Sequence, residues 1–167
     1  MAKYALGLKS VKFGTPTGTA TMPAVLEAFA QTVKGSMTIS ETEASVNDFT
    51  VEEQDAPVEQ IITDNSKWEA VWKCYNISSE ILTKVKGGES VTGASETTWK
   101  APASSSILKL AMEIETTSGA KFQVPRASVV ARFDGTVGKD DMLQLEVKAT
   151  ALDPGDGGSS YMVVNPD

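Results

Sequence analysis

The stretch that decides the fold reads Ile107-Leu108-Lys109-Leu110-Ala111-Met112-Glu113-Ile114-Glu115. Large apolar side chains occupy the even positions of this stretch, and most of the residues between them are charged. A period of two is typical of a strand that buries one face and exposes the other. The sequence therefore predicts a half-buried strand over Ile107–Glu115, followed by a turn at Thr117-Ser118-Gly119.

Two segments downstream continue the pattern. In Lys121–Phe133 the inward apolar positions are even-numbered before Pro125 and odd-numbered after it. Because a shift of one residue would turn the strand inside out, we expect Pro125 to be an edge position or a bulge that restores the register. Leu143–Ala151 alternates without interruption. Together the three strands predict a meander with one apolar face, which the rest of the chain must cover.

Size and composition indicate one ordinary globular domain over residues 1–167. The chain is 41% hydrophobic and 22% charged, and a chain of 167 residues can bury roughly two-thirds of its unfolded surface. Near the end, 153–158 is turn-forming and Tyr161–Val164 could be a last short strand or an ordered tail. We expect the C-terminal tail, from about 153 to 167, to be flexible.

The formal charge of −7 is concentrated in one segment. Between Lys34 and Lys67 lie eight acids and no base, and subtracting those eight charges from −7 leaves +1 for the rest of the chain. This polarity suits head-to-tail association of identical copies, which closes into rings or continues as a filament, although an acidic loop that only maintains solubility explains it equally well. The acids, which we take as candidates for an inter-subunit or lumen-facing segment, are Glu41, Glu43, Asp48, Glu52, Glu53, Asp55, Glu59 and Asp64.

The beginning of the chain predicts a strand over Tyr4–Phe13, with a change of parity near Gly7 or Ser10. The next apolar run is ambiguous. Its spacing fits one face of a helix, yet the residues from Ala30 to Val33 fit a short strand equally well.

The acidic segment predicts a long loop between two strands. A strand over Ser36–Glu43 precedes it, and a strand over Val58–Thr63 follows. The connection Ala44–Pro57 is too polar to bury, and loops of this length in a compact domain are usually functional or disordered. We expect this loop to be solvated and poorly ordered in an isolated subunit.

The middle of the chain predicts one strand and one helix. Trp68–Tyr75 places two tryptophans and Cys74 on the same face, so we expect the tryptophans to anchor the core. Ser78 or Ser79 can cap a short helix that ends at Lys86 before a pair of glycines. The polar segment after it, Glu89–Ser106, predicts a loop that could contain a short strand at Glu96–Lys100.

The residues argue against a catalytic or metal site, and we predict no catalytic residue, cofactor or metal. No His is present to act as the base for a serine nucleophile. Glu113 and Glu115 are expected to lie on a solvated strand face, not to form a catalytic pair. Asp153 and Asp156 could bind calcium, but a plain turn is preferred because no closing acidic residue follows. Cys74 is expected to be an inert core thiol.

The sequence also bears on the cell compartment and on nucleic acid. No window approaches the run of about 18 apolar residues that spans a bilayer, and residues 1–7 lack the apolar core of a signal peptide. We therefore expect no membrane partner and a protein made in a cytoplasm or in an assembly formed there. The bases of the second half are scattered, which argues against a surface that grips duplex DNA.

The order of these features resembles that of a bacteriophage major tail tube protein of the long, non-contractile type, within the superfamily that includes type VI secretion tubes. The resemblance covers most of the chain from about Thr32. It rests on Val33-Lys34-Gly35-Ser36 before a strand, the long acidic loop, the strand Trp68–Tyr75 leading into the Ser78–Lys86 helix with Gly87-Gly88, and the closing blocks Phe122–Ala127, Lys139–Leu145 and Ala149–Pro154.

The resemblance implies a mainly β fold, a β-sandwich or squashed β-barrel with one short flanking helix at about Ser78–Lys86. It also implies a structural virion protein that assembles into stacked six-membered rings, located in the virion tail and built in the host cytoplasm. The resulting tube would hold the tape-measure protein, end at a tail-terminator protein and pass DNA without specific binding. In such proteins the long loop, here Ala44–Pro57, reaches toward a neighbouring subunit.

A second hypothesis is a β-sandwich that binds carbohydrate or a receptor at a phage or bacterial surface. Sugar sites stack on exposed aromatic rings, and Trp99, in a polar loop, is the strongest candidate for such a ring. An enzyme is the third hypothesis, and the missing His argues against it.

Overall fold

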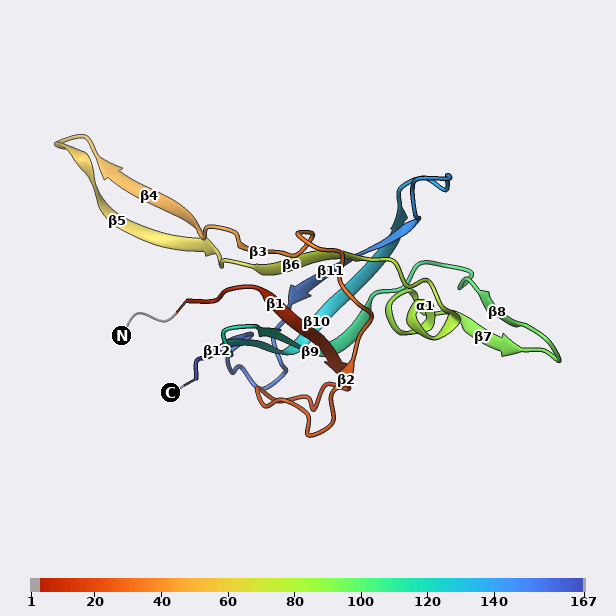
Figure 1. Cartoon of the computed structure of the whole chain (residues 1–167). Coiled ribbons are helices and arrows are strands. Elements are labelled where there is room, and N and C mark those ends of the chain that lie inside the picture. Colours follow the sequence, from red (N-terminus) through yellow and green to blue (C-terminus); the bar gives the residue numbers. More distant parts are fainter. Residues whose placement is uncertain (1–3, 167) are drawn as a thin grey trace.

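The computed structural model describes residues 4–166 and consists mainly of one strongly curved antiparallel sheet (Figure 1). Two hairpins and one short helix complete it. In the order in which they lie in the sheet, the strands are β2 (Glu27–Ala28), β1 (Leu8–Gly14), β9 (Leu108–Thr116), β10 (Lys121–Asp134), β11 (Gln144–Ala151), β6 (Trp68–Cys74) and β3 (Thr38–Glu41), with β12 (Met162–Val164) paired to β10. The hairpins are β4 (Ser45–Val51) with β5 (Gln54–Asp64), and β7 (Glu89–Thr92) with β8 (Thr97–Lys100); the helix is α1 (Ser79–Lys86).

The predicted meander β9–β10–β11 forms the centre of the sheet and is confirmed. Its inward side chains are completely buried along β11, where Leu145, Val147 and Ala149 have no exposed surface. The β9–β10 ladder shifts register between Val124 and Ala127, so the predicted bulge around Pro125 is also confirmed. The bulge keeps the apolar side chains of β10 on one face on both sides of the proline.

The core forms because the curved sheet brings β1 opposite β6. Phe13 of β1 lies with its ring centroid 6.0 Å from that of Trp72 of β6, and the Phe29 ring contacts both in T-shaped arrangements, with interplanar angles of 81° and 89°. Burial along β6 alternates as predicted, with Trp68 and Trp72 inside. This sandwich-like arrangement confirms the predicted mainly β fold class.

Helix α1 closes one side of the core and is confirmed. Ser78 caps it, since its hydroxyl accepts a hydrogen bond from the backbone N–H of Ile81. The apolar stripe Ile81, Leu82 and Val85 is buried. Gly87, with a φ of 73°, ends the helix in the left-handed region that favours glycine.

From residue 4 up to α1 the described chain is extended or irregular and contains no helix. Strand β1 begins at Leu8, four residues later than predicted, because Gly7 has a φ of 67° and Tyr4 and Leu6 remain exposed. The expected parity change is present as a register shift between Leu8 and Ser10. Of the two alternatives for the next run the extended one is correct, because β2 pairs with β1 and Thr32 bridges to Cys74.

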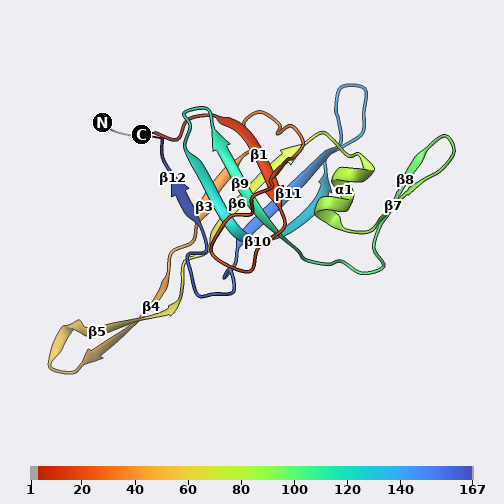
Figure 2. The same cartoon turned by 90° about the horizontal axis from the view of Figure 1, so that it is seen from below.

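Two segments predicted as loops are hairpins, and these predictions were wrong. The hairpins β4–β5 and β7–β8 leave the sheet on opposite sides in both views (Figures 1 and 2). In β7–β8 the expected short strand is present at Thr97–Lys100, but its partner Glu89–Thr92 was not predicted. A two-stranded ladder satisfies backbone groups that a loop would leave to water, which favours pairing even in a polar sequence.

The outer face of the sheet carries cross-strand ion pairs. The expectation that Glu113 is solvated on this face was wrong. Glu113, expected on a solvated face, is only 5% exposed and receives hydrogen bonds from Gln123 Nε2 at 2.7 Å and Lys12 Nζ at 3.4 Å. Its neighbour Glu115 pairs with Lys9 at 2.7 Å. Long polar side chains on adjacent strands therefore cover the carboxylate that the strand pattern assigned to water.

Acid is expected to destabilise the protein partly through this face. The hydrogen bond from Lys73 lowers the pKa of Asp134, and the hydrogen bond from Lys9 lowers the pKa of Glu115. A carboxyl with a lowered pKa contributes stability above its unfolded pKa, about 4, and loses it as the pH falls through the folded value. Urea midpoints of the wild type should therefore fall from about pH 5 to pH 2 more steeply than those of Lys73→Met. Lys100→Met, on an exposed hairpin, is the control and should follow the wild type; equal slopes for all three would contradict the prediction.

Candidate assembly interface

The β4–β5 hairpin is the most exposed part of the described chain. The prediction that Ala44–Pro57 is an irregular loop was wrong. The strand expected at Val58–Thr63 is longer than predicted, because it begins at Gln54 and pairs with Ser45–Val51. Every residue of both strands is exposed. Glu52 and Glu53 form the turn, and no glycine or asparagine there indicated a hairpin in the sequence.

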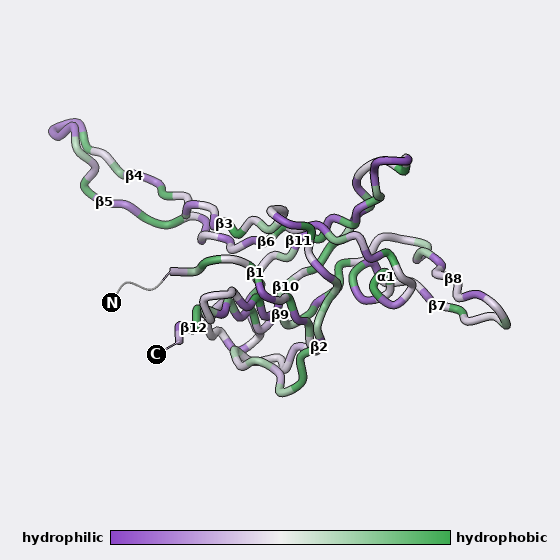
Figure 3. Tube along the Cα trace, in the orientation of Figure 1, coloured by the Kyte–Doolittle hydropathy of each residue, from purple (hydrophilic) through white to green (hydrophobic). Residues whose placement is uncertain are grey.

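Exposed apolar side chains occupy both faces of this hairpin. Val46 pairs across the ladder with Ile62, and cross-strand partners share a face, which by strand alternation also carries Val58. Phe49 and Ile61 lie on the opposite face. In Figure 3 apolar segments alternate with polar ones along both strands. The exposed fractions are Val46 55%, Phe49 46%, Val51 43%, Val58 51%, Ile61 47% and Ile62 63%.

The eight predicted acids lie on or beside this hairpin. Asp48 is on β4, the turn holds two, β5 carries Asp55, Glu59 and Asp64, and Glu41 and Glu43 lie at its base. Among residues 4–166 none of the ion pairs involves these acids; those pairs lie on the outer sheet face and around Lys84. The hairpin therefore projects negative charge that its own subunit does not neutralise.

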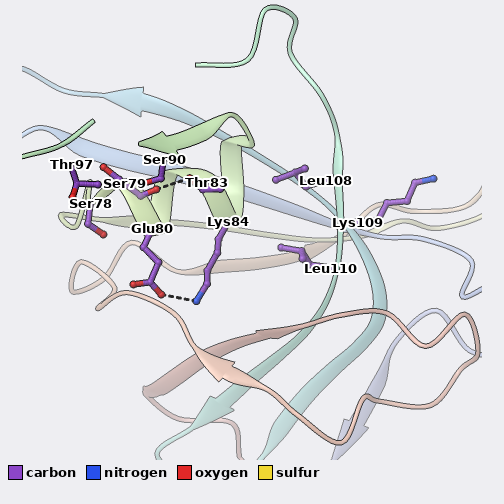
Figure 4. A pocket seen from close by; sticks show the side chains of 10 residues that line it. All are labelled: Ser78, Ser79, Glu80, Thr83, Lys84, Ser90, Thr97, Leu108, Lys109 and Leu110. Carbon is purple, nitrogen blue, oxygen red and sulfur yellow. Dashed lines mark hydrogen bonds and ion pairs between the residues drawn. The ribbon is translucent and has the colours of Figure 1, made fainter. Parts of the chain in front are cut away.

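A second surface feature is the cleft beside α1 (Figure 4). Its volume is about 930 Å³, and Leu108 and Leu110 point from β9 toward the helix. Lys84 pairs there with Glu27 at 2.8 Å and Glu80 at 3.1 Å, and the hydrogen bond to Glu27, then that to Glu80, raises its pKa. The cleft is lined by Ser78, Ser79, Glu80, Thr83, Lys84, Ser90, Thr97, Leu108, Lys109 and Leu110.

This cleft does not have the features expected of a sugar site. No aromatic ring is among its lining residues. Trp99, the predicted stacking platform, is half-buried against the core and donates its Nε1–H to the carbonyl oxygen of Gly87 at 2.9 Å. The expectation that Trp99 is an exposed ring was therefore wrong, because the β7–β8 hairpin folds it back onto the end of α1.

The remaining candidate groups have structural partners. In the part of the chain from 4 to 166, no group of three or more His, Cys, Asp or Glu residues could hold a metal ion. Asp156 accepts hydrogen bonds from the backbone N–H groups of Ala20 and Gly158, which lower its pKa and make it a turn residue. Cys74 is fully buried, and burial raises the pKa of its thiol. No helix within residues 4–166 has the length and apolar character to cross a bilayer.

Comparison with known proteins identifies the family of this chain. The family model described as "Phage tail tube protein" matches residues 12–167, which include all the sheet strands except the start of β1. A search of curated proteins found no match. The matched range includes every segment on which the resemblance rests, so this chain belongs to the phage tail tube protein family, whose members are structural proteins of the virion tail.

Proposed function

We propose that this tail tube protein polymerises into stacked six-membered rings that form the hollow tube of a phage tail. The tube is assembled in the host cytoplasm, encloses a tape-measure protein, ends at a tail-terminator protein and passes the genome without binding it specifically. In this proposal the chain acts as a single domain, and the β4–β5 hairpin, with its candidate acids, is a contact between subunits. The family supports self-association into a tube.

The exposed β4–β5 hairpin is the observation that carries the proposal. An isolated two-stranded hairpin is at best marginally stable in water, and neither outer edge of this one has a strand partner among residues 4–166. Apolar side chains on both faces cannot be buried by the subunit itself, since every hairpin residue is exposed. Surfaces of this kind mark sites of protein association. A neighbouring copy would bury the faces and could pair with the edges.

The hairpin also supports a head-to-tail contact. A projecting element on one side of the molecule inserts into a different surface of its neighbour, which is a heterologous contact that generates rings or filaments. Within residues 4–166 the acids of the hairpin form no ion pair with a basic side chain, and Lys100 and Lys109 form no ion pair with an acid. Opposite charges on separate surfaces favour contact between copies over contact within one.

Negative-stain electron microscopy of concentrated full-length protein tests the proposal. Hollow tubes or stacked rings of uniform diameter, with six subunits visible end-on, are the expected result. Monomers that persist through long incubation at moderate salt, with or without a purified tape-measure protein, would contradict it.

Charge reversal at the turn distinguishes an inter-subunit position from a lumen-facing one. If the turn contacts bases of a neighbour, Glu52→Lys with Glu53→Lys should raise the protein concentration needed for tube formation, because attractive pairs become repulsive. Light scattering against protein concentration measures this. Asp140→Lys with Asp141→Lys, in the β10–β11 loop, is the matched control. Tubes that form normally from the turn variant but retain DNA would instead place these acids in the lumen.

A further inference from the structure

The β4–β5 hairpin can be held in direction only at its base. Both strands are exposed along their whole length, and within the described part of the chain each pairs only with the other. Strand β5 has 11 residues and is therefore roughly 36 Å long. Over that length a rotation of about 10° at the base moves the tip by about 6 Å. Whatever fixes the base therefore decides where the tip is.

The base consists of the last residue of β3 and the first residue of β6. These residues, Glu41 and Trp68, face each other across the β3–β6 ladder. The connections to the hairpin leave from this pair, with Thr42 and Lys67 joined by backbone hydrogen bonding at 3.0 Å. Ser66 donates a hydrogen bond to Glu41 Oε1 at 2.8 Å. All of these contacts come from β3, β6 and the connections that lead from them into the hairpin.

Tyr161 reaches the same base from the C-terminal segment and contacts both strands. Its ring stacks on Trp68, with centroids 6.0 Å apart and planes inclined by 25°. Its hydroxyl donates a hydrogen bond to Glu41 Oε2 at 3.2 Å. The hydrogen bond to the Glu41 carboxylate raises the pKa of Tyr161.

Tyr161 is itself tied to the centre of the sheet. The next residues form β12, in which Met162 pairs with Gln123 of β10. A contact at the hairpin base is thereby connected through the backbone to the central strand. Because stacking on Trp68 restrains β6 and the hydrogen bond restrains β3, one side chain limits rotation of the two strands against each other.

We propose that Tyr161 is a positioning residue that sets the direction in which the β4–β5 hairpin leaves the sheet. This inference rests on the proposed function, in that a directed hairpin matters because it must reach a neighbouring copy. Without the stack on Trp68 and the hydrogen bond to Glu41, the hairpin adopts many directions, and in few of them can it contact a neighbouring copy. The protein concentration needed for tube formation then rises, roughly twofold to tenfold for an aromatic contact of ordinary strength.

Electron–electron distance measurements on spin-labelled monomers test the inference directly. Thr50→Cys on the hairpin and Val130→Cys on the sheet provide two exposed labelling sites, while buried Cys74 stays unlabelled in the folded protein. The parent should give one narrow distance distribution. Tyr161→Ala should broaden it, and Tyr161→Phe, which keeps the stack and loses only the hydrogen bond, should broaden it less. Tyr75→Ala, at an exposed tyrosine just after β6, is the matched control and should leave it unchanged.

The outcomes separate this inference from the proposed function. A distribution in Tyr161→Ala as narrow as in the parent, with circular dichroism showing a folded protein, would overturn the inference even if the parent forms tubes. If Tyr161→Ala does not fold, Tyr161→Phe decides, because it removes the hydrogen bond to Glu41 and leaves the core intact, whereas Glu41→Ala would also remove the hydrogen bond from Ser66. Glu41→Gln retains an acceptor oxygen for the Tyr161 hydroxyl and should keep the narrow distribution of the parent. Because the distances are measured on monomers, failure of the parent to form tubes would contradict only the proposed function.

Discussion

Replacing Val46 and Ile62 together by threonine is expected to suppress tube formation strongly while leaving the subunit folded. The two side chains face each other across the hairpin and are 55% and 63% exposed. Full burial of such a side chain contributes roughly 1.5–3 kcal/mol, and about half of each remains to be buried by a neighbour. Burial of the pair therefore contributes roughly 1.5–3 kcal/mol to each contact between subunits. Losing that contribution lowers the association constant about tenfold to hundredfold.

Threonine suits this test because it keeps the β-branched shape that a strand favours. The thermal midpoint of the double variant should stay close to that of the wild type, since exposed substitutions usually change stability by less than about 0.5 kcal/mol. Electron microscopy and light scattering measure assembly. Val137→Thr, at a side chain 82% exposed in the β10–β11 loop, controls for the loss of an exposed apolar group. Normal tubes from the double variant would exclude this hairpin face as an interface.

Replacing Trp72 by alanine is expected to destabilise the subunit by about 3–5 kcal/mol, the usual range for a large buried aromatic residue. Trp72 is fully buried and contacts the rings of Phe13 and Phe29. It therefore joins β6 to β1 across the core, and the cavity left by alanine would lie between the two sides of the curved sheet. Urea unfolding followed by far-ultraviolet circular dichroism measures the loss.

Trp72→Phe is the informative companion variant. The Nε1–H of Trp72 is buried, with no hydrogen-bond partner among the described residues. An unsatisfied buried donor costs about 1–3 kcal/mol, so removing it offsets part of the packing lost with the smaller ring. We expect Trp72→Phe to lose much less stability than Trp72→Ala. Equal losses for the two variants would contradict this prediction.

The sheet centre and the helix were predictable because their signals are local. Alternation in Ile107–Glu115 and Leu143–Ala151 needs only the period of a strand, and a capping serine with two following glycines needs only the chemistry of helix ends. The bulge at Pro125 was predictable for the same reason, since a change of parity within one strand must be corrected where it occurs.

The negative charge of the candidate interface was predictable from the sequence, but its hairpin structure was not. Eight acids without a base are visible in the sequence, yet the hairpin that carries most of them has no turn signal at Glu52 and Glu53. Its apolar positions do not alternate strictly, because side chains such as Val46 and Phe49 lie on opposite faces. Only the register between β4 and β5 shows which of them share a face.

Local patterns in the sequence by themselves determined the meander, the helix, the buried tryptophans and the place of the acidic segment, because each depends on neighbours within a few residues. The tertiary structure alone decided what depends on residues far apart in the chain. It covers Glu113 with Lys12 and Gln123, turns Trp99 back onto Gly87, and brings Tyr161 against Glu41 and Trp68. Each of these contacts joins segments that only the curvature and pairing of the sheet bring together, and no periodicity along one strand encodes them.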